Sequence, residues 1–142
     1  MTGQSILVVD DDEDVREIIQ LLLASSGYEV DTAADGFAAI EKLRAGKLPN
    51  LILLDLRMPG MDGEQFMTII RRALADQHVP VVLISGDGEA WRMAQTLGAE
   101  GFLQKPVELV DLLETIAKQA SPAGTGGSLQ FGPAEEALLS SN

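Results

Sequence analysis

Cysteine is absent from the 142-residue sequence, and its absence excludes several kinds of chemistry. A chain without thiols has no disulfide framework, no thiolate metal site and no cysteine nucleophile. Histidine is nearly absent as well, because His78 is the only one, and a single imidazole cannot form a histidine-rich metal site. A metal ion bound to this chain would therefore need oxygen ligands.

Long apolar runs and basic residues are also scarce. No run approaches the roughly 18 residues of a membrane span, and the amino terminus lacks the basic and apolar regions of a signal peptide. We therefore expect a cytoplasmic protein without membrane insertion. The 22 acidic residues outnumber the 10 basic ones and give a formal net charge of −12. Such a surface repels phosphate backbones, so direct nucleic-acid binding is not expected. The acidity fits simple solubility as well as attraction of cations or basic partners.

The apolar residues, 46% of the chain, suffice for one domain with a core. Short apolar runs alternate with segments whose apolar residues recur at helical spacing. The runs predict strands at residues 6–9, 28–33, 51–55, 79–84 and 101–105, and the segment that follows each strand predicts a helix, five in all. Strict alternation with short connections predicts an α/β fold, in which helices cover both faces of a parallel sheet.

The composition changes near Ser121, where Ser-Pro-Ala-Gly-Thr-Gly-Gly-Ser is typical of a flexible linker. Residues 133–139 could form one or two helical turns or belong to a disordered end. We therefore expect one domain at residues 1–120, a linker or tail at 121–142, and no output domain.

Polar residues follow four of the predicted strands. Four unbroken apolar residues, 51–54, lead to Asp55, a pattern typical of a strand buried on both faces. The other strand ends are Asp10 with Asp11, Ser85, and Lys105. All carboxyl ends of a parallel sheet lie at one edge, which is where ligands bind in open α/β sheets. Each residue alone could be a helix cap, a turn or a surface residue, but their coincidence at four strand ends favours one site.

The residue types at this edge indicate phosphoryl chemistry on a carboxylate. Three converging carboxylates repel one another unless they share a proton or a cation, and an all-oxygen site suits a hard ion such as Mg²⁺. Lys105 and Ser85 supply a positive charge and a hydroxyl donor for an anion, most simply a phosphoryl group. A carboxylate can accept such a group to form an acyl phosphate. Asp55, expected at the centre of the set, is the natural acceptor.

These motifs resemble the receiver domain of bacterial two-component response regulators over about residues 4 to 120. The resemblance is carried by Ile6-Leu-Val-Val-Asp10-Asp11, Leu53-Leu-Asp55-Leu-Arg-Met-Pro59-Gly-Met-Asp-Gly63, Leu83-Ile-Ser85-Gly and Lys105-Pro106. It implies a flavodoxin-like, doubly wound fold with strand order 2-1-3-4-5. It further implies a role in phosphorelay signal transduction, with Asp55 phosphorylated by a sensor histidine kinase or histidine phosphotransfer protein.

The same resemblance assigns roles to the remaining residues of the site. Asp10, Asp11, Asp55 and the backbone carbonyl of Arg57 would hold Mg²⁺. Ser85 would be the switch hydroxyl, Lys105 the phosphate-contacting lysine in a usually cis bond to Pro106, and Phe102 the switch aromatic.

Two further expectations concern what is particular to this chain. Side chains at Arg57 and Asp87 would flank the path of a hydrolytic water that Gly86 leaves open, so these three positions are expected to set the phosphoryl lifetime. Unchanged hydrolysis in Arg57→Ala and Asp87→Ala would contradict this, and the two residues could instead only pair with each other or with solvent. Trp91 lies off the apolar stripe of its helix and is expected on a partner surface, unless it merely covers a neighbouring loop.

The expected function is a phosphorylation-controlled binding module, not a turnover enzyme, with an unknown downstream protein target. An unphosphorylated pseudo-receiver that acts as a scaffold is the alternative. An Asp-nucleophile phosphatase of the haloacid type is less favoured, because it needs a second aspartate where Arg57 stands. No phosphate-binding loop or dinucleotide fingerprint supports a nucleotide-binding protein.

Overall fold

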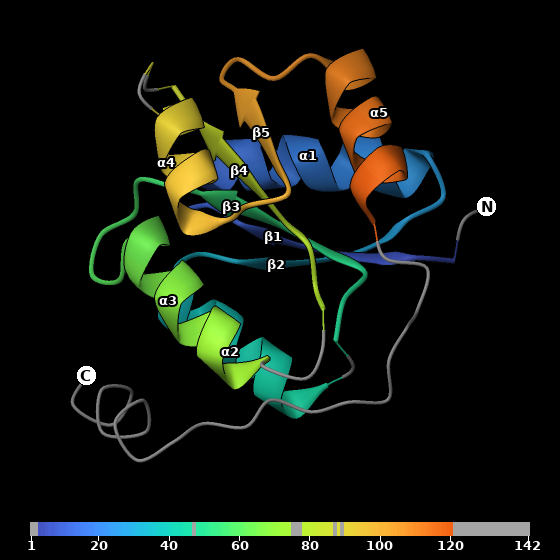
Figure 1. Cartoon of the computed structure of the whole chain (residues 1–142). Coiled ribbons are helices and arrows are strands. Elements are labelled where there is room, and N and C mark those ends of the chain that lie inside the picture. Colours follow the sequence, from blue (N-terminus) through green and yellow to red (C-terminus); the bar gives the residue numbers. More distant parts are fainter. Residues whose placement is uncertain (1–2, 47, 75–77, 87, 89, 121–142) are drawn as a thin grey trace.

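The computed structural model describes residues 3–46, 48–74, 78–86, 88 and 90–120, which form a five-stranded parallel sheet with helices between the strands (Figure 1). The strand order is β2-β1-β3-β4-β5. The strands are β1 (Ser5–Val9), β2 (Glu29–Ala33), β3 (Leu51–Asp55), β4 (Val81–Ser85) and β5 (Gly101–Gln104). The helices are α1 (Glu13–Ser25), α2 (Gly36–Ala45), α3 (Gly63–Ala73), α4 (Ala90–Leu97) and α5 (Leu109–Gln119). The predicted flavodoxin-like fold and strand order are confirmed.

Helices cover both faces of the sheet, and each face has its own apolar layer (Figure 1). Ile6 and Val8 of β1 pack with α1 and α5 on one face, whereas Leu7 and Val9 pack with α2, α3 and α4 on the other. The same alternation holds along β3 and β4. Every residue of these two strands is buried, so they appear in the sequence as continuous apolar runs.

Aspartate side chains cap the amino-terminal ends of three helices. Asp12 accepts hydrogen bonds from the backbone N–H groups of Asp14 and Val15, and Asp35 accepts one from Ala38. Asp62 and Gln65 form a reciprocal capping box at α3. These caps satisfy N–H groups that have no partner inside a helix. No helix in the described part of the chain has the length and apolar character needed to cross a bilayer.

The observed strands differ slightly in their bounds from the predicted ones. β4 begins at Val81 instead of 79, because Pro80 has no N–H to donate, although its carbonyl accepts a hydrogen bond from Ile52 N at 2.9 Å. β2 begins at Glu29, one residue after Tyr28, and β5 ends at Gln104, one residue before Lys105. Helix α5 ends at Gln119, and the predicted tail at 121–142 lies outside the described residues.

Candidate phosphoacceptor site

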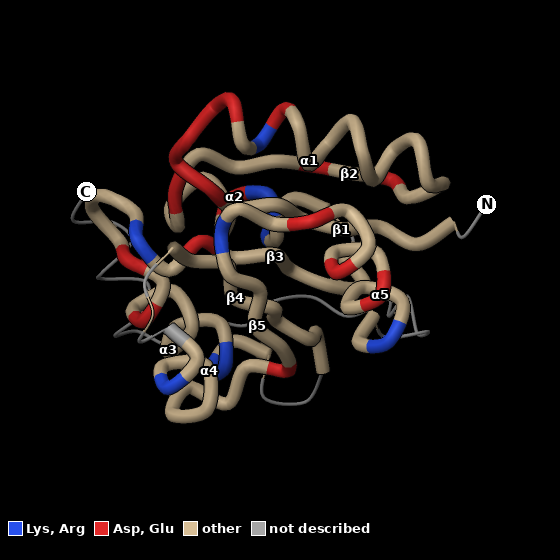
Figure 2. The backbone as a smooth tube through the Cα atoms, turned by 90° about the horizontal axis from the view of Figure 1, so that it is seen from above, with Lys and Arg blue, Asp and Glu red and all other residues tan. Residues whose placement is uncertain are grey.

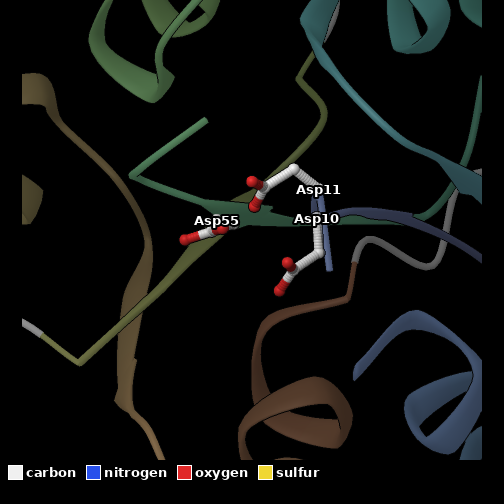
Figure 3. Close-up of side chains that lie close together, drawn as sticks. All are labelled: Asp10, Asp11 and Asp55. Atoms are coloured by element: carbon white, nitrogen blue, oxygen red, sulfur yellow. The ribbon is translucent and has the colours of Figure 1, made fainter. Parts of the chain in front are cut away.

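Three carboxylates meet at the carboxyl ends of two neighbouring strands (Figure 3). Asp55 is the last residue of β3, and Asp10 and Asp11 directly follow β1. One oxygen atom from each carboxylate lies within 4.8 Å of the others. Asp10 and Asp55 are only 1% and 4% exposed, whereas Asp11 faces solvent. The sheet topology therefore brings together residues that are 45 positions apart, as the sequence predicts.

Lys105 supplies the positive charge of this site. Its Nζ lies 3.1 Å from Asp10 Oδ2 and 3.6 Å from Asp55 Oδ2. Its backbone N–H donates a hydrogen bond of 2.9 Å to the carbonyl of Ser85, which is itself buried at the end of β4. The peptide bond from Lys105 to Pro106 is cis. The predicted convergence of strand ends β1, β3, β4 and β5 is thus present in the structure.

Burial and neighbouring charges change the ionisation of Asp55 and Lys105. Burial, and then the negative charge of Asp10, raise the pKa of Asp55 from 3.8 to about 7, although the Arg57 N–H and the Lys105 ammonium oppose this change. Burial alone would lower the pKa of Lys105, but contact with Asp10 and the charges of Asp55 and Asp11 outweigh burial and raise it. The site therefore favours charged Lys105 and disfavours a third negative charge at Asp55.

Hydrogen bonds hold Asp10 on several sides. Its N–H donates to Ala33 O at 3.1 Å, and its Oδ1 accepts from Asp12 N at 2.9 Å. Its carbonyl oxygen accepts from Arg16 Nη1 at 2.7 Å. Sequence reasoning missed Arg16. A usable signal was present, because Arg16 is the only lysine or arginine among residues 1–41.

The loop between β3 and α3 starts at Asp55 and is held close to it. Arg57 N donates to Asp55 Oδ1 at 3.2 Å, and Gly63 N donates to Leu56 O at 3.0 Å. A Cβ atom added at Gly63 would lie 2.8 Å from Leu56 Cα, so the loop and α3 meet where only glycine fits. Met58 and Met61 bury their side chains under the loop. The backbone around Arg57, predicted to supply a metal-binding carbonyl, is therefore anchored at both ends.

The other predicted residues lie at different distances from this centre. Phe102 is half-buried on β5 against the apolar layer that contains α2, α3 and α4. Gly86 is exposed, and a Cβ atom added to it would lie 3.9 Å from Lys105 Cβ. Arg57 is exposed, and Asp87 lies outside the described residues. Trp91 is 47% exposed, with Arg92 Cζ 5.6 Å from its ring centre. Its expected exposure is confirmed, whereas its partner role and the lifetime role of Arg57, Gly86 and Asp87 stay predictions.

The residues present fit a small divalent cation. All three side chains offer oxygen, the ligand type that Mg²⁺ prefers. Asp10 Oδ2 is buried and accepts no well-aligned hydrogen bond from the residues that the structure describes, although the Lys105 ammonium lies near it. A buried carboxylate oxygen in this condition has capacity left for a ligand. Asp10, Asp11 and Asp55 could therefore hold a metal ion.

Comparison with known proteins connects this geometry to a family. A family model described as the response regulator receiver domain matches residues 6–117. Protein PilG of Pseudomonas aeruginosa is 34% identical over 116 residues, which are 80% of this chain and 85% of PilG. Response regulator PleD of Caulobacter vibrioides is 42% identical over 116 residues, which are 78% of this chain but only 25% of PleD. The match to PleD therefore concerns one part of a longer protein.

Solved structures show the same similarity in three dimensions. The chemotaxis protein CheY4 of Vibrio cholerae is 30% identical, with a TM-score of 0.75 over 82% of this chain and 98% of that one. A putative response regulator from Chloroflexus aurantiacus is 30% identical, with a TM-score of 0.76 over 82% of this chain and 96% of that one. The similarity thus extends over nearly the whole length of both solved chains.

Proposed function

Because the chain belongs to the response regulator receiver domain family, we propose that it accepts a phosphoryl group on Asp55 in phosphorelay signalling. The donor would be the phosphohistidine of a sensor histidine kinase or a histidine phosphotransfer protein. The observation that supports this proposal is the clustering of buried Asp55 with the Asp10–Asp11 pair and the Lys105 ammonium group. We further propose a cytoplasmic location, where such a donor is available.

The transfer can be written with the residues of this site. An Asp55 carboxylate oxygen attacks the phosphorus, an acyl phosphate forms, and the phosphorus–nitrogen bond to the imidazole breaks. The imidazole keeps the electron pair of that bond and takes up a proton. Lys105 offers its ammonium group to the phosphoryl oxygens, since it lies 3.6 Å from Asp55 Oδ2. Mg²⁺, held by Asp10, Asp11, Asp55 and the Arg57 carbonyl, would neutralise charge on the phosphoryl group.

Phosphorylation would then change a binding surface. A phosphoryl group adds charge of roughly −2 and strong acceptor oxygens, toward which Ser85 and Lys105 can move. Phe102 could rotate into the space that Ser85 leaves, and this would alter the surface near α4, where Trp91 is exposed. A downstream protein would recognise that surface. In this reading the chain is a switch that acquires and loses one phosphoryl group, not a turnover enzyme.

Intact-mass measurement after incubation with acetyl phosphate and Mg²⁺ tests the proposal. We expect the wild-type protein to gain the mass of one phosphoryl group. The gain should disappear in Asp55→Asn and in EDTA. Asp31→Asn is the matched control, because it removes a carboxylate from the exposed edge strand β2, away from the strand ends. That variant should be phosphorylated like the wild type.

A wild-type protein that gains no mass would contradict the proposal. If Trp91 fluorescence also failed to respond to the phosphoryl mimic beryllofluoride, the scaffold alternative would replace it. Phosphorylation that persists in Asp55→Asn would place the acceptor at another residue.

A further inference from the structure

Arg16 lies close to a strongly acidic segment of the chain and is the only lysine or arginine among residues 1–41. It lies near the start of α1, two residues after Asp14, and residues 10–14 are all acidic. Figure 2 shows this acidic segment at the start of α1, followed by a basic segment. Among the described residues, Arg16 nevertheless makes no ion pair with these neighbours. Its half-buried guanidinium donates through Nη1 to the backbone carbonyl of Asp10 at 2.7 Å.

This hydrogen bond acts on the peptide unit that joins Asp10 to Asp11. A peptide unit is planar, so fixing its carbonyl oxygen also fixes the direction in which the Cα atom of Asp11 is placed. The side chain of Asp10 has separate supports in Asp12 N and Lys105. Asp11 is different, because its side chain is exposed although its carboxylate takes part in the cluster. Its direction depends on the backbone that Arg16 holds and on a side-chain hydrogen bond with Asp55.

We propose that Arg16 is a positioning residue for the cation site, which acts by orienting the Asp10–Asp11 peptide so that the Asp11 carboxylate points at Asp55. The bond is charge-assisted and short, which makes it stronger than a neutral hydrogen bond. This proposal rests on the proposed function, since it assumes that the three carboxylates bind Mg²⁺.

The direction in which Mg²⁺ affinity changes on removal of Arg16 distinguishes this positioning role from a purely electrostatic one. A positive charge near the carboxylates repels an incoming cation, so its removal would strengthen Mg²⁺ binding if Arg16 acted only through its charge. Removal of a positioning residue should instead weaken Mg²⁺ binding. Loss of groups that orient metal ligands typically weakens metal affinity by about 10-fold or more. Removal of Arg16 should therefore weaken Mg²⁺ binding despite removing the repulsion.

Calorimetric titration with MgCl₂, without any phosphodonor, measures directly whether Mg²⁺ affinity falls or rises. We expect Arg16→Met to bind Mg²⁺ about 10-fold more weakly than the wild type. Arg16→Lys keeps the charge but has a shorter, single donor group, so its affinity should lie between the two. Arg72→Met, an exposed arginine on α3, is the matched control for the loss of one positive charge and should bind like the wild type.

A second readout separates positioning from contact with the phosphoryl group. The Mg²⁺ concentration that gives half-maximal phosphorylation by acetyl phosphate should rise in Arg16→Met, whereas the rate at saturating Mg²⁺ should stay close to that of the wild type. A lower saturating rate together with an unchanged half-maximal concentration would overturn the proposal.

The remaining outcomes are equally decisive. Unchanged or tighter Mg²⁺ binding by Arg16→Met would overturn the positioning role and leave the proposed function intact. If Arg16→Met does not fold, Arg16→Lys decides alone, because wild-type affinity in that variant would overturn the role and weaker binding would support it. A wild-type protein that binds no Mg²⁺ would overturn both this inference and the metal dependence of the proposed function.

Discussion

At the scale of single residues, Asp55 combines two properties that oppose each other. It is almost completely buried, yet its proposed reaction needs the ionised form as nucleophile. Burial and the Asp10 charge raise its pKa to about 7, so the metal-free protein holds a proton there under weakly acidic conditions. A cation bound among the carboxylates would favour the ionised form. Metal binding would thus prepare the acceptor for reaction.

The raised pKa of Asp55 predicts a pH-dependent stability of the metal-free protein. Between pH 3.8 and about 7 the folded state binds a proton at Asp55 that the unfolded state does not, so stability falls as pH rises through this window. At most about 4 kcal/mol is lost, since one pKa unit corresponds to about 1.4 kcal/mol. Thermal unfolding in EDTA from pH 4 to 8 measures this loss. Asp55→Asn should reduce it, and an Asn variant with the full wild-type slope would contradict the prediction.

The sequence revealed the acidic, hydroxyl and lysine groups of the site because each directly follows an apolar strand. The same reasoning did not identify Arg16. Its role depends on where a long side chain ends, and helical spacing places only its Cα atom. The pKa of Asp55 was equally out of reach, because it depends on burial and on distances of a few ångströms.

At the scale of elements, the loop from β3 to α3 determines how the end of the sheet that carries Asp55, the proposed acceptor, is held. The Pro59-Gly60 turn lets the chain reverse, with Gly60 at a φ of +81°, a conformation that glycine adopts easily. Gly63 then begins α3 directly against the backbone of Leu56. The helix start and the acceptor loop therefore cannot move independently.

Gly63→Ala tests this close approach. Alanine is the better helix former by about 1 kcal/mol, so propensity alone predicts stabilisation. The added Cβ, however, would lie 2.8 Å from Leu56 Cα and 3.1 Å from its carbonyl oxygen. We expect a net loss of about 1–3 kcal/mol, as in other overpacked sites. Denaturant unfolding provides the measurement.

Gly46→Ala at the end of α2 is the matched control. Its backbone is extended, with a φ of −137°, and the added Cβ would lie 3.7 Å from Lys42 O. Its stability should stay within about 0.5 kcal/mol of the wild type. Equal stability of the two variants would show that α3 and the acceptor loop are not tightly fitted.

The sequence predicted all five strands and all five helices, but it placed some of their ends one or two residues away. The fourth strand shows the reason. Val79 and Pro80 are apolar and buried like a strand, yet the ladder of this strand begins only at Val81. An apolar sequence pattern indicates which residues are buried, whereas hydrogen bonds to the neighbouring strand determine where a strand ends.

At the scale of the whole molecule, the net charge of −12 predicts two separable responses to salt. General self-repulsion is screened by any salt, whereas a specific site responds only to an ion that fits it. At equal ionic strength, MgCl₂ should therefore raise the melting temperature more than NaCl does. A Mg²⁺ concentration 100 times the dissociation constant corresponds to about 2.7 kcal/mol of added stability.

Asp11→Asn identifies the site that is responsible. This variant should keep the response to NaCl and lose most of the additional response to MgCl₂, because Asp11 is one of the three clustered carboxylates. An additional MgCl₂ response that survives in full would mean that the stabilising ion binds elsewhere on the acidic surface.

The order of the site residues along the chain also has a consequence for biosynthesis. Asp10, Asp11 and Asp55 leave the ribosome well before Lys105, which follows the last strand of the sheet. Domains made in this direction have their amino-terminal part available first. A nascent chain that stops short of β5 therefore has the whole acidic cluster but lacks the ammonium group beside Asp10 and Asp55. Completion of the sheet and compensation of its buried charge occur in the same step of synthesis.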